Sequence, residues 1–158
     1  MKTLQALATL AGLAFVAAMP TCNSATAQDH KVVAADNVQW GPAPPSLPKG
    51  AEVAVLAGDP TKEGPFTLRL KFPSNYKIPA HSHPSFEAVT VISGQMNFGM
   101  GDKLDESNAQ RVGAGGFIHL PENMNHFAFS SEASVVQIHS IGPFSIKYVN
   151  PEDDPSKK

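Results

Sequence analysis

The chain has 158 residues, of which 42% are hydrophobic and 16% charged, a length and composition that fit one folded domain and exclude a disordered chain. The formal net charge of -2, from 12 basic and 14 acidic residues, excludes a basic nucleic-acid surface and a polybasic membrane patch. A single cysteine excludes an internal disulfide and a thiolate-rich metal site. The 14 prolines and 12 glycines favour many turns and argue against a helical bundle.

Residues 1–27 have the order of a secretory signal peptide. A basic start at Lys2 precedes a nearly continuous apolar run over 6–19 and a small-x-small cleavage site at Ala25-Thr26-Ala27. The apolar run is shorter than the roughly 20 residues that span a bilayer. The alternatives are an N-terminal amphipathic or membrane helix, and a lipoprotein modified at Cys22. A secretory signal cleaved after Ala27 predicts a periplasmic or secreted protein with no membrane attachment after cleavage. Cleavage also removes Cys22, so the exported protein has no thiol to oxidise.

A polar, proline-rich N-terminal arm is predicted over 28–50. Residues 28–37 are polar, and residues 40–48 are WGPAPPSLP, with four prolines in nine positions. This composition favours an extended, polyproline-like conformation. Trp40 is expected to fix the arm to the domain or to a partner subunit. The alternative is a mobile linker with one exposed aromatic side chain.

From residue 51 to 150 the sequence predicts one all-β domain. Apolar and polar residues alternate over 66–72, which is the two-residue period of a strand with unlike faces. Short β-prone runs recur between turn signals such as Gly142-Pro143. The expected strands are 51–56, 66–72, 87–93, 95–100, 117–120, 126–129, 135–139 and 145–149. This spacing predicts a sandwich or a barrel, jelly rolls included, and residues 151–158 are expected to be a disordered tail.

Four side chains with metal-binding groups lie in two short segments of this domain. Residues two apart in an extended chain point to the same side, so His81 and His83 can present both imidazoles to one point. A turn at 84–85 allows Glu87 to approach that point, and His126 supplies a third imidazole at the start of a later strand. Three neutral imidazoles and a carboxylate suit one divalent transition metal (Fe, Mn, Ni, Cu or Zn) and leave two octahedral positions open.

These segments resemble the two motifs of the cupin superfamily. The first motif is His-x-His, three residues, Glu, six residues and Gly; the second is Gly, five residues, Pro and a His five positions on. The matching positions are His81, His83, Glu87, Gly94, Gly115, Pro121 and His126. The resemblance covers 75–94 and 115–130 and implies a cupin-like jelly-roll β-barrel. The chain is similar to small, single-domain, exported bacterial cupins (cupin type-2-like), whose family does not fix a reaction.

Three positions depart from the cupin pattern. The glycine expected six residues before His81 is Asn75, and the glycine after Pro121 is Asn123. Asparagine is the non-glycine residue that best tolerates left-handed backbone angles, so we expect both turns to form. Ser130 stands where the family often has asparagine, and a structural role is expected for it.

Strand parity predicts which side chains surround the ligands. Met96 and Phe98 share one face of their strand and form either simple core or a pocket wall. Gln137 and Arg69 are the polar candidates for hydrogen bonding to the ligands from behind, and a solvated strand face is the alternative for Arg69. The remaining histidines are not expected to bind the metal; they are His30, His119 and His139.

The leading hypothesis is a metal-dependent enzyme that acts on a small organic molecule. Resemblance to dioxygenase-type cupins makes an oxygenase of a phenolic or dicarbonyl compound the first class to test. The alternatives are a non-catalytic periplasmic module that binds or senses a small molecule, and a structural barrel with a vestigial site. No hydrolase triad order or phosphate loop is present. No nucleic-acid partner is expected, and an edge strand makes a homodimer the expected assembly.

Overall fold

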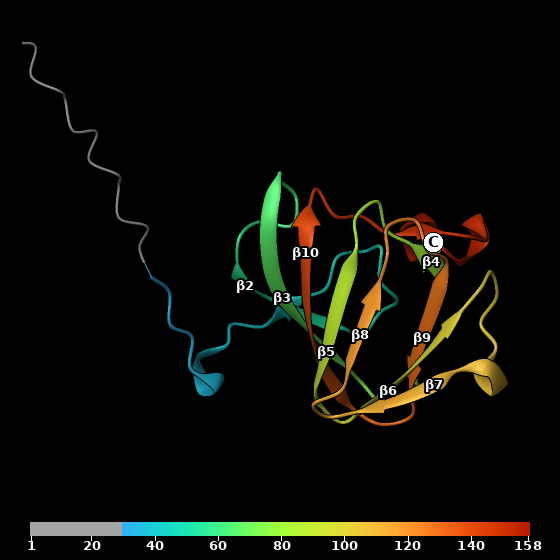
Figure 1. Ribbon diagram of the computed structural model, residues 1–158, viewed down its shortest axis with the longest axis horizontal. Helices are drawn as coiled ribbons and strands as arrows, with labels where there is room; N and C mark the ends of the chain where they lie inside the picture. The colour runs from blue at the N-terminus through green and yellow to red at the C-terminus, as the bar shows by residue number, and fades with distance from the viewer. Residues whose placement is uncertain (1–29) are drawn as a thin grey trace, which may run out of the picture. The chain divides into compact units, whose positions relative to one another are not determined.

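The computed structural model describes residues 30–158, so the predicted signal peptide over 1–27 lies outside the described residues. The described chain is all-β, as predicted, with eleven strands and four single-turn 3-10 helices. Six strands form one sheet in the order β1-β2-β3-β10-β5-β8, and five form a second in the order β11-β4-β9-β6-β7 (Figure 1). No helix among these residues is long and apolar enough to cross a membrane.

All eight predicted strands are present, some with shifted bounds, and the last is shorter than the expected 145–149. Three further strands were not predicted. The six-stranded sheet consists of β1 (Gly41–Pro42), β2 (Glu52–Ala57), β3 (Gly64–Phe72), β10 (Ser134–Gly142), β5 (Glu87–Ser93) and β8 (Phe117–Leu120). The five-stranded sheet consists of β11 (Lys147–Tyr148), β4 (Tyr76–Ser82), β9 (His126–Ser130), β6 (Gln95–Met100) and β7 (Gln110–Gly113). The 3-10 turns are η1 (Ala35–Asn37), η2 (Glu106–Asn108), η3 (Pro151–Asp153) and η4 (Pro155–Lys157). Every strand pair is antiparallel.

Two long strands, β3 and β10, form the centre of the six-stranded sheet. They pair without interruption from Ser134 opposite Phe72 to Gly142 opposite Gly64. Alternate residues of each are buried, because successive side chains of a strand point to opposite faces. The buried face packs against apolar side chains of the five-stranded sheet, among them Ile78, Phe98 and Ala128 in one hydrophobic core.

Both asparagine substitutions at glycine positions adopt the backbone angles that a glycine would favour there. Asn75 has φ of 60° and Asn123 has φ of 59°, both in the left-handed region that asparagine tolerates best among non-glycine residues. Asn75 turns the chain from β3 into β4. Asn123 lies in the loop before β9, where its N–H donates to the carbonyl of His83 at 2.8 Å. The expectation that both turns survive is confirmed.

The proline-rich arm packs on the domain instead of forming a separate linker. Its strand β1 pairs with β2, Leu47 is buried within the main core, and the ring of Trp40 stacks under the ammonium of Lys71 at 4.8 Å. The hydroxyls of Tyr76 and Tyr148 donate to the carbonyls of Pro48 and Ser46. The boundary expected at residue 51 therefore does not separate arm from domain, because an apolar side chain between prolines anchors the segment.

The C-terminal segment also differs from the disordered tail that was expected. It follows β11, which pairs with β4, and holds the turns η3 and η4 (Figure 1). Asn150 accepts a hydrogen bond from the N–H of Glu152, and Asp154 accepts one from that of Ser156. A capping side chain followed by proline at the first position of a helix favours a helical start, which is why a polar sequence forms turns here.

Candidate metal centre

The four predicted ligands come from three strands and from both sheets. His81 lies in β4 and His83 directly follows it, His126 begins β9, and Glu87 begins β5 in the facing sheet. Because β4 and β9 are antiparallel with His81 directly opposite His126, their imidazoles are neighbours across the ladder. A register shift between Ile78 and His81 marks an irregularity where β4 approaches the site, a common feature of strands near functional sites.

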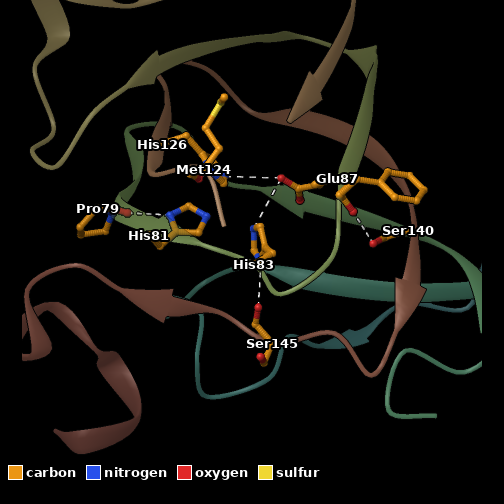
Figure 2. A network of polar contacts seen from close by, with 9 residues as sticks. Pro79, His81, His83, Glu87, Met124, His126, Ser140 and Ser145 are labelled. Carbon is orange, nitrogen blue, oxygen red and sulfur yellow. Dashed lines mark hydrogen bonds and ion pairs between the residues drawn. The ribbon is translucent and has the colours of Figure 1, made fainter. Parts of the chain in front are cut away.

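The three imidazoles converge on one point. Their ligand atoms all lie within 4.8 Å of one another, and the ring centroids of His81 and His126 are 4.2 Å apart. Oε2 of Glu87 lies 3.6 Å from Nε2 of His83 and 3.5 Å from Nε2 of His126 (Figure 2). All four side chains are buried, with exposed fractions between 2% and 7%. The structure thus brings together the set predicted from the sequence.

Backbone carbonyls fix the orientation of each ring. Nδ1 of His81 lies 2.7 Å from the carbonyl oxygen of Pro79, and Nδ1 of His126 lies 2.9 Å from that of Met124. Nδ1 of His83 lies 2.8 Å from the carbonyl oxygen of Ser145 (Figure 2). A carbonyl oxygen only accepts, so each Nδ1 carries the proton and the neutral ring has its lone pair on Nε2. This second contact is what orients histidine ligands in metal sites.

The protonation states favour a cation at the centre. Burial lowers the pKa of His81 to about 3, and the imidazoles of His126 and His83 add to the effect. Burial also lowers the pKa of His83, against the opposing influence of Glu87. Burial by itself raises the pKa of the Glu87 carboxyl, but the facing histidines outweigh it and leave that pKa below its ordinary value. A buried carboxylate therefore faces imidazole lone pairs at neutral pH.

A divalent cation fits this arrangement. Nε2 of His83 is buried without a hydrogen-bond partner, and a buried polar atom left unsatisfied is costly. Two donors about 2.1 Å from one ion lie at most about 4.2 Å apart, which is close to the 4.8 Å within which the three histidine ligand atoms lie. Three buried histidines could hold a metal, and imidazole with carboxylate suits Fe, Mn, Ni, Cu or Zn without selecting among them.

The other histidines lie elsewhere, as the sequence predicted. His119 is exposed on β8 and stacks with Phe86 at 5.8 Å. His139 is exposed on β10, where its ring nitrogens contact the hydroxyl of Thr67 and the amide of Gln137. His30 is exposed at the start of the described chain.

Arg69 and Gln137 do not contact the ligands. This corrects the expectation for Gln137, whereas for Arg69 it agrees with the alternative of an outer strand face. They are direct partners across β3 and β10, and Nε of Arg69 donates to Oε1 of Gln137 at 3.0 Å. Their buried strand neighbours, such as Leu68 and Ile138, face the core, so alternation points Arg69 and Gln137 to the opposite face of the sheet. They belong to an outer polar ladder that includes His139.

Met96 and Phe98 are both core and pocket wall. Both are buried in the main hydrophobic core. They also line a cavity of about 30 Å³ between the sheets, which His81, Glu87 and His126 reach from one side. Strand parity therefore placed them correctly beside the ligands.

A larger cavity of about 410 Å³ lies beside the ligands, and His81, His83 and Glu87 line it. Most of its wall is apolar, and two segments that sequence reasoning did not assign to the site supply much of it. From the arm come Pro42, Pro44, Ser46 and Leu47; from the segment after β10 come Phe144, Ser145 and Ile146. The ring of Phe144 stacks on that of His83 at 4.4 Å. For the arm, the sequence signals were Trp40, expected to fix it to the domain, and the apolar Leu47 among prolines. For the second segment, the signal was the strand expected over 145–149, which did not indicate a contact with the site.

Solved structures with a similar fold are cupins. The polyketide cyclase RemF from Streptomyces resistomycificus matches with TM-score 0.68 and 17% identity over 82% of this chain and 92% of that one. A candidate acetylacetone dioxygenase from Methylibium petroleiphilum PM1 matches with TM-score 0.62 and 22% identity over 81% and 86%. An RmlC-like cupin from Shewanella frigidimarina NCIMB 400 matches with TM-score 0.56 and 11% identity over 72% and 92%.

These likenesses establish the cupin fold, as the two sequence motifs implied. No curated protein matches the sequence. The model of one family, described as Domain of unknown function (DUF4437), matches residues 31–155, which include both sheets, the arm from residue 31 and the four clustered side chains. The chain belongs to this family, and it has the cupin fold.

Proposed function

We propose that this protein is a metal-dependent enzyme acting on a small, largely apolar organic molecule, with His81, His83, Glu87 and His126 as the ligands of one divalent transition metal. The observation that carries the proposal is that three imidazoles, each with Nδ1 bound to a carbonyl, meet a buried carboxylate. That carboxylate and two of the imidazoles, His81 and His83, line a cavity of about 410 Å³. When bound, the metal would supply Lewis-acid or redox chemistry.

The cavity wall supports an apolar substrate that brings its own metal-binding oxygen. Among the described residues that line it, the side chains with polar groups besides the ligands are the hydroxyls of Ser46, Thr61 and Ser145. Apolar walls such as Leu68 and Ile146 exclude water and bind a carbon skeleton. An oxygen-bearing head group directed at the histidines, as in a dicarbonyl or a phenol, is the substrate class that these walls favour.

The similar structures support an oxygenase as the first reaction to test. One is a candidate acetylacetone dioxygenase, and acetylacetone is a small dicarbonyl compound. RemF is a polyketide cyclase, so the fold also carries chemistry other than oxygenation, and fold alone does not select the reaction. The dicarbonyl and phenolic compounds proposed above are therefore candidates for oxygenation and for other reactions alike.

One observation favours the alternative of a non-catalytic binding module. The ionisable side chains among the described residues of the large cavity are His81, His83 and Glu87, which are themselves proposed ligands. The cavity therefore offers no separate general acid or base. If the protein only binds its ligand, it would act as an exported sensor or carrier, and export depends on the proposed signal peptide over 1–27.

Metal analysis of matched variants tests the site. His81→Ala is expected to lose most of the metal, whereas His119→Ala, which removes an exposed histidine outside the site, is expected to keep it. Circular dichroism of both variants shows whether each is folded. Full metal occupancy in folded His81→Ala would overturn the proposed centre.

Oxygen consumption across a panel of dicarbonyl and phenolic compounds then separates the two functions. Turnover that requires the metal supports the enzyme. Tight binding of a compound without oxygen uptake or product favours the binding module.

A further inference from the structure

The small cavity behind the ligands is a second space at the candidate metal centre. It occupies about 30 Å³, enough for a molecule of one or two heavy atoms, since a water molecule needs about 10 to 15 Å³ by this measure. Core side chains of both sheets line it, among them Val89 and Val136 from one sheet and Met96 and Ala128 from the other.

The inner cavity adjoins the large one, and the ligand cluster lines both. His83 lines only the large cavity, and His126 lines only the inner one. His81 and Glu87 line both. Leu70, Ile78 and Ile138 also line both cavities, so the two spaces are adjacent. A different molecule can therefore occupy each of them beside the ligand cluster.

The chemistry of the inner wall selects an apolar occupant. All the polar side chains that line it are proposed metal ligands, namely His81, Glu87 and His126. A buried water usually makes about three hydrogen bonds, and cavities lined by aliphatic and aromatic side chains stay dry and bind apolar atoms such as xenon. The other side chains that line it, such as Val89, Phe98 and Val136, offer a water molecule no hydrogen bond.

We propose that the inner cavity is a binding site for an apolar molecule of diatomic size, dioxygen being the biological example, held against His81, Glu87 and His126 while an organic molecule occupies the large cavity. The proposal rests on the proposed function in one respect, because dioxygen is useful there only to an oxygenase. The apolar cavity itself exists independently of any reaction.

Xenon is the probe, because it occupies apolar cavities and scatters anomalously. Crystals of the protein as isolated are pressurised with xenon, and an anomalous peak is expected between Met96, Ala128 and the imidazoles. An ordered water with two or more hydrogen bonds at this place, or xenon confined to the large cavity, would overturn the proposal. The result does not depend on metal content, so the failure of His81→Ala to lose metal would refute the proposed function without affecting it.

Two one-carbon additions provide the control. Val89→Ile fills the inner cavity and is expected to abolish the inner xenon peak, whereas Val53→Ile, which lines only the large cavity, is expected to leave it unchanged. If Val89→Ile does not fold, Ala128→Val is used to fill the inner cavity instead. If the metal-loaded protein consumes oxygen, Val89→Ile is expected to raise the KM for dioxygen several-fold. Val53→Ile is expected to raise the KM for the organic substrate instead. An inner xenon peak that persists in folded Val89→Ile and Ala128→Val contradicts the assignment.

Discussion

At the scale of single residues, the clustered histidines share one arrangement, in which a backbone carbonyl holds Nδ1 and turns Nε2 towards the other rings. The carbonyls of Pro79 and Met124 lie two residues before their histidines, so local chain geometry orients those two rings. His83 instead depends on the carbonyl of Ser145, 62 residues away. Its orientation therefore requires the complete fold.

The lowered histidine pKa values predict that the metal-free protein becomes less stable in acid. An unfolded histidine takes up a proton near its ordinary pKa of 6.5, whereas His81 and His83 resist protonation in the folded state. As the pH falls below about 6.5 the unfolded state binds more protons, and the free energy of unfolding decreases by at most about 1.4 kcal/mol per pH unit for each of these histidines. For His81 the loss continues to about pH 3.

Protonation of the Glu87 carboxyl also lowers the free energy of unfolding, at a lower pH than for the histidines. Its folded pKa is depressed, so its contribution is present above the unfolded value and disappears as the pH falls through the folded one. Urea unfolding between pH 7.5 and pH 4 measures the combined slope of the free energy of unfolding against pH. We expect His81→Gln to flatten it and His119→Gln to leave it unchanged, and a slope that is equal in all three proteins contradicts the account.

The left-handed turn before β9 gives a second prediction for a single residue. Asn123→Ala should lower the free energy of unfolding by about 1 kcal/mol, because alanine tolerates φ of 59° less well than asparagine. Asn123→Gly should cost little, since glycine adopts this conformation freely. Chemical denaturation of the two variants checks the difference. Equal stability of the alanine and glycine variants would show that the backbone angle is not what asparagine provides.

At the scale of elements, the arm is predicted to act as a fixed wall of the large cavity. Leu47→Ala should lower the free energy of unfolding by about 2 kcal/mol or more, because Leu47 is 7% exposed within the core. It should also accelerate proteolytic cleavage within 41–50, since Leu47 anchors this segment. Val32→Ala, at a side chain that is 84% exposed, is the control and should change neither. Unaltered cleavage in Leu47→Ala would mean that the other contacts of the arm, the β1–β2 pairing and the tyrosine hydroxyls among them, hold it without Leu47.

Most strands were predictable because local alternation determines them, but those fixed by distant partners were not. The predicted bounds of β5, β6 and β8 match the structure residue for residue. The strand β4 contains Pro79 and a register shift, so it was recognised only through its histidines. The short strands β1 and β7 have no apolar alternation and exist because β2 and β6 offer them hydrogen-bonding edges.

The clustering of the four candidate ligands could be predicted from the sequence, but the rest of the cavity wall could not. His81, His83, Glu87 and His126 were recognisable because their spacing is fixed by strand geometry. Gln137 was misplaced although it alternates with the buried residues of its strand, and this alternation already indicated the face away from the core, as it did for Arg69. The arm and the segment around Phe144 could not be assigned, because long-range packing alone brings them to the cavity.

At the scale of the whole molecule, we propose a homodimer that pairs through the outer face beside the edge strand β8. Phe117 on β8 is 60% exposed and Ile92 on the adjacent β5 is 41% exposed, and exposed apolar side chains beside an open edge favour association. Light scattering during size exclusion is expected to give a dimer for the wild type and a monomer for Phe117→Asp. Val55→Asp, a similar change at a side chain that lines the large cavity, should stay dimeric. A monomeric wild type refutes the assembly.

The central claim is that His81, His83, Glu87 and His126 hold one metal ion. The most direct measurement is a crystal structure with diffraction data on both sides of the absorption edge of the metal found by elemental analysis. The account predicts one anomalous peak about 2.1 Å from Nε2 of each histidine and beside the Glu87 carboxylate. A peak elsewhere in the molecule, or no peak among the three rings in metal-saturated protein, would contradict it.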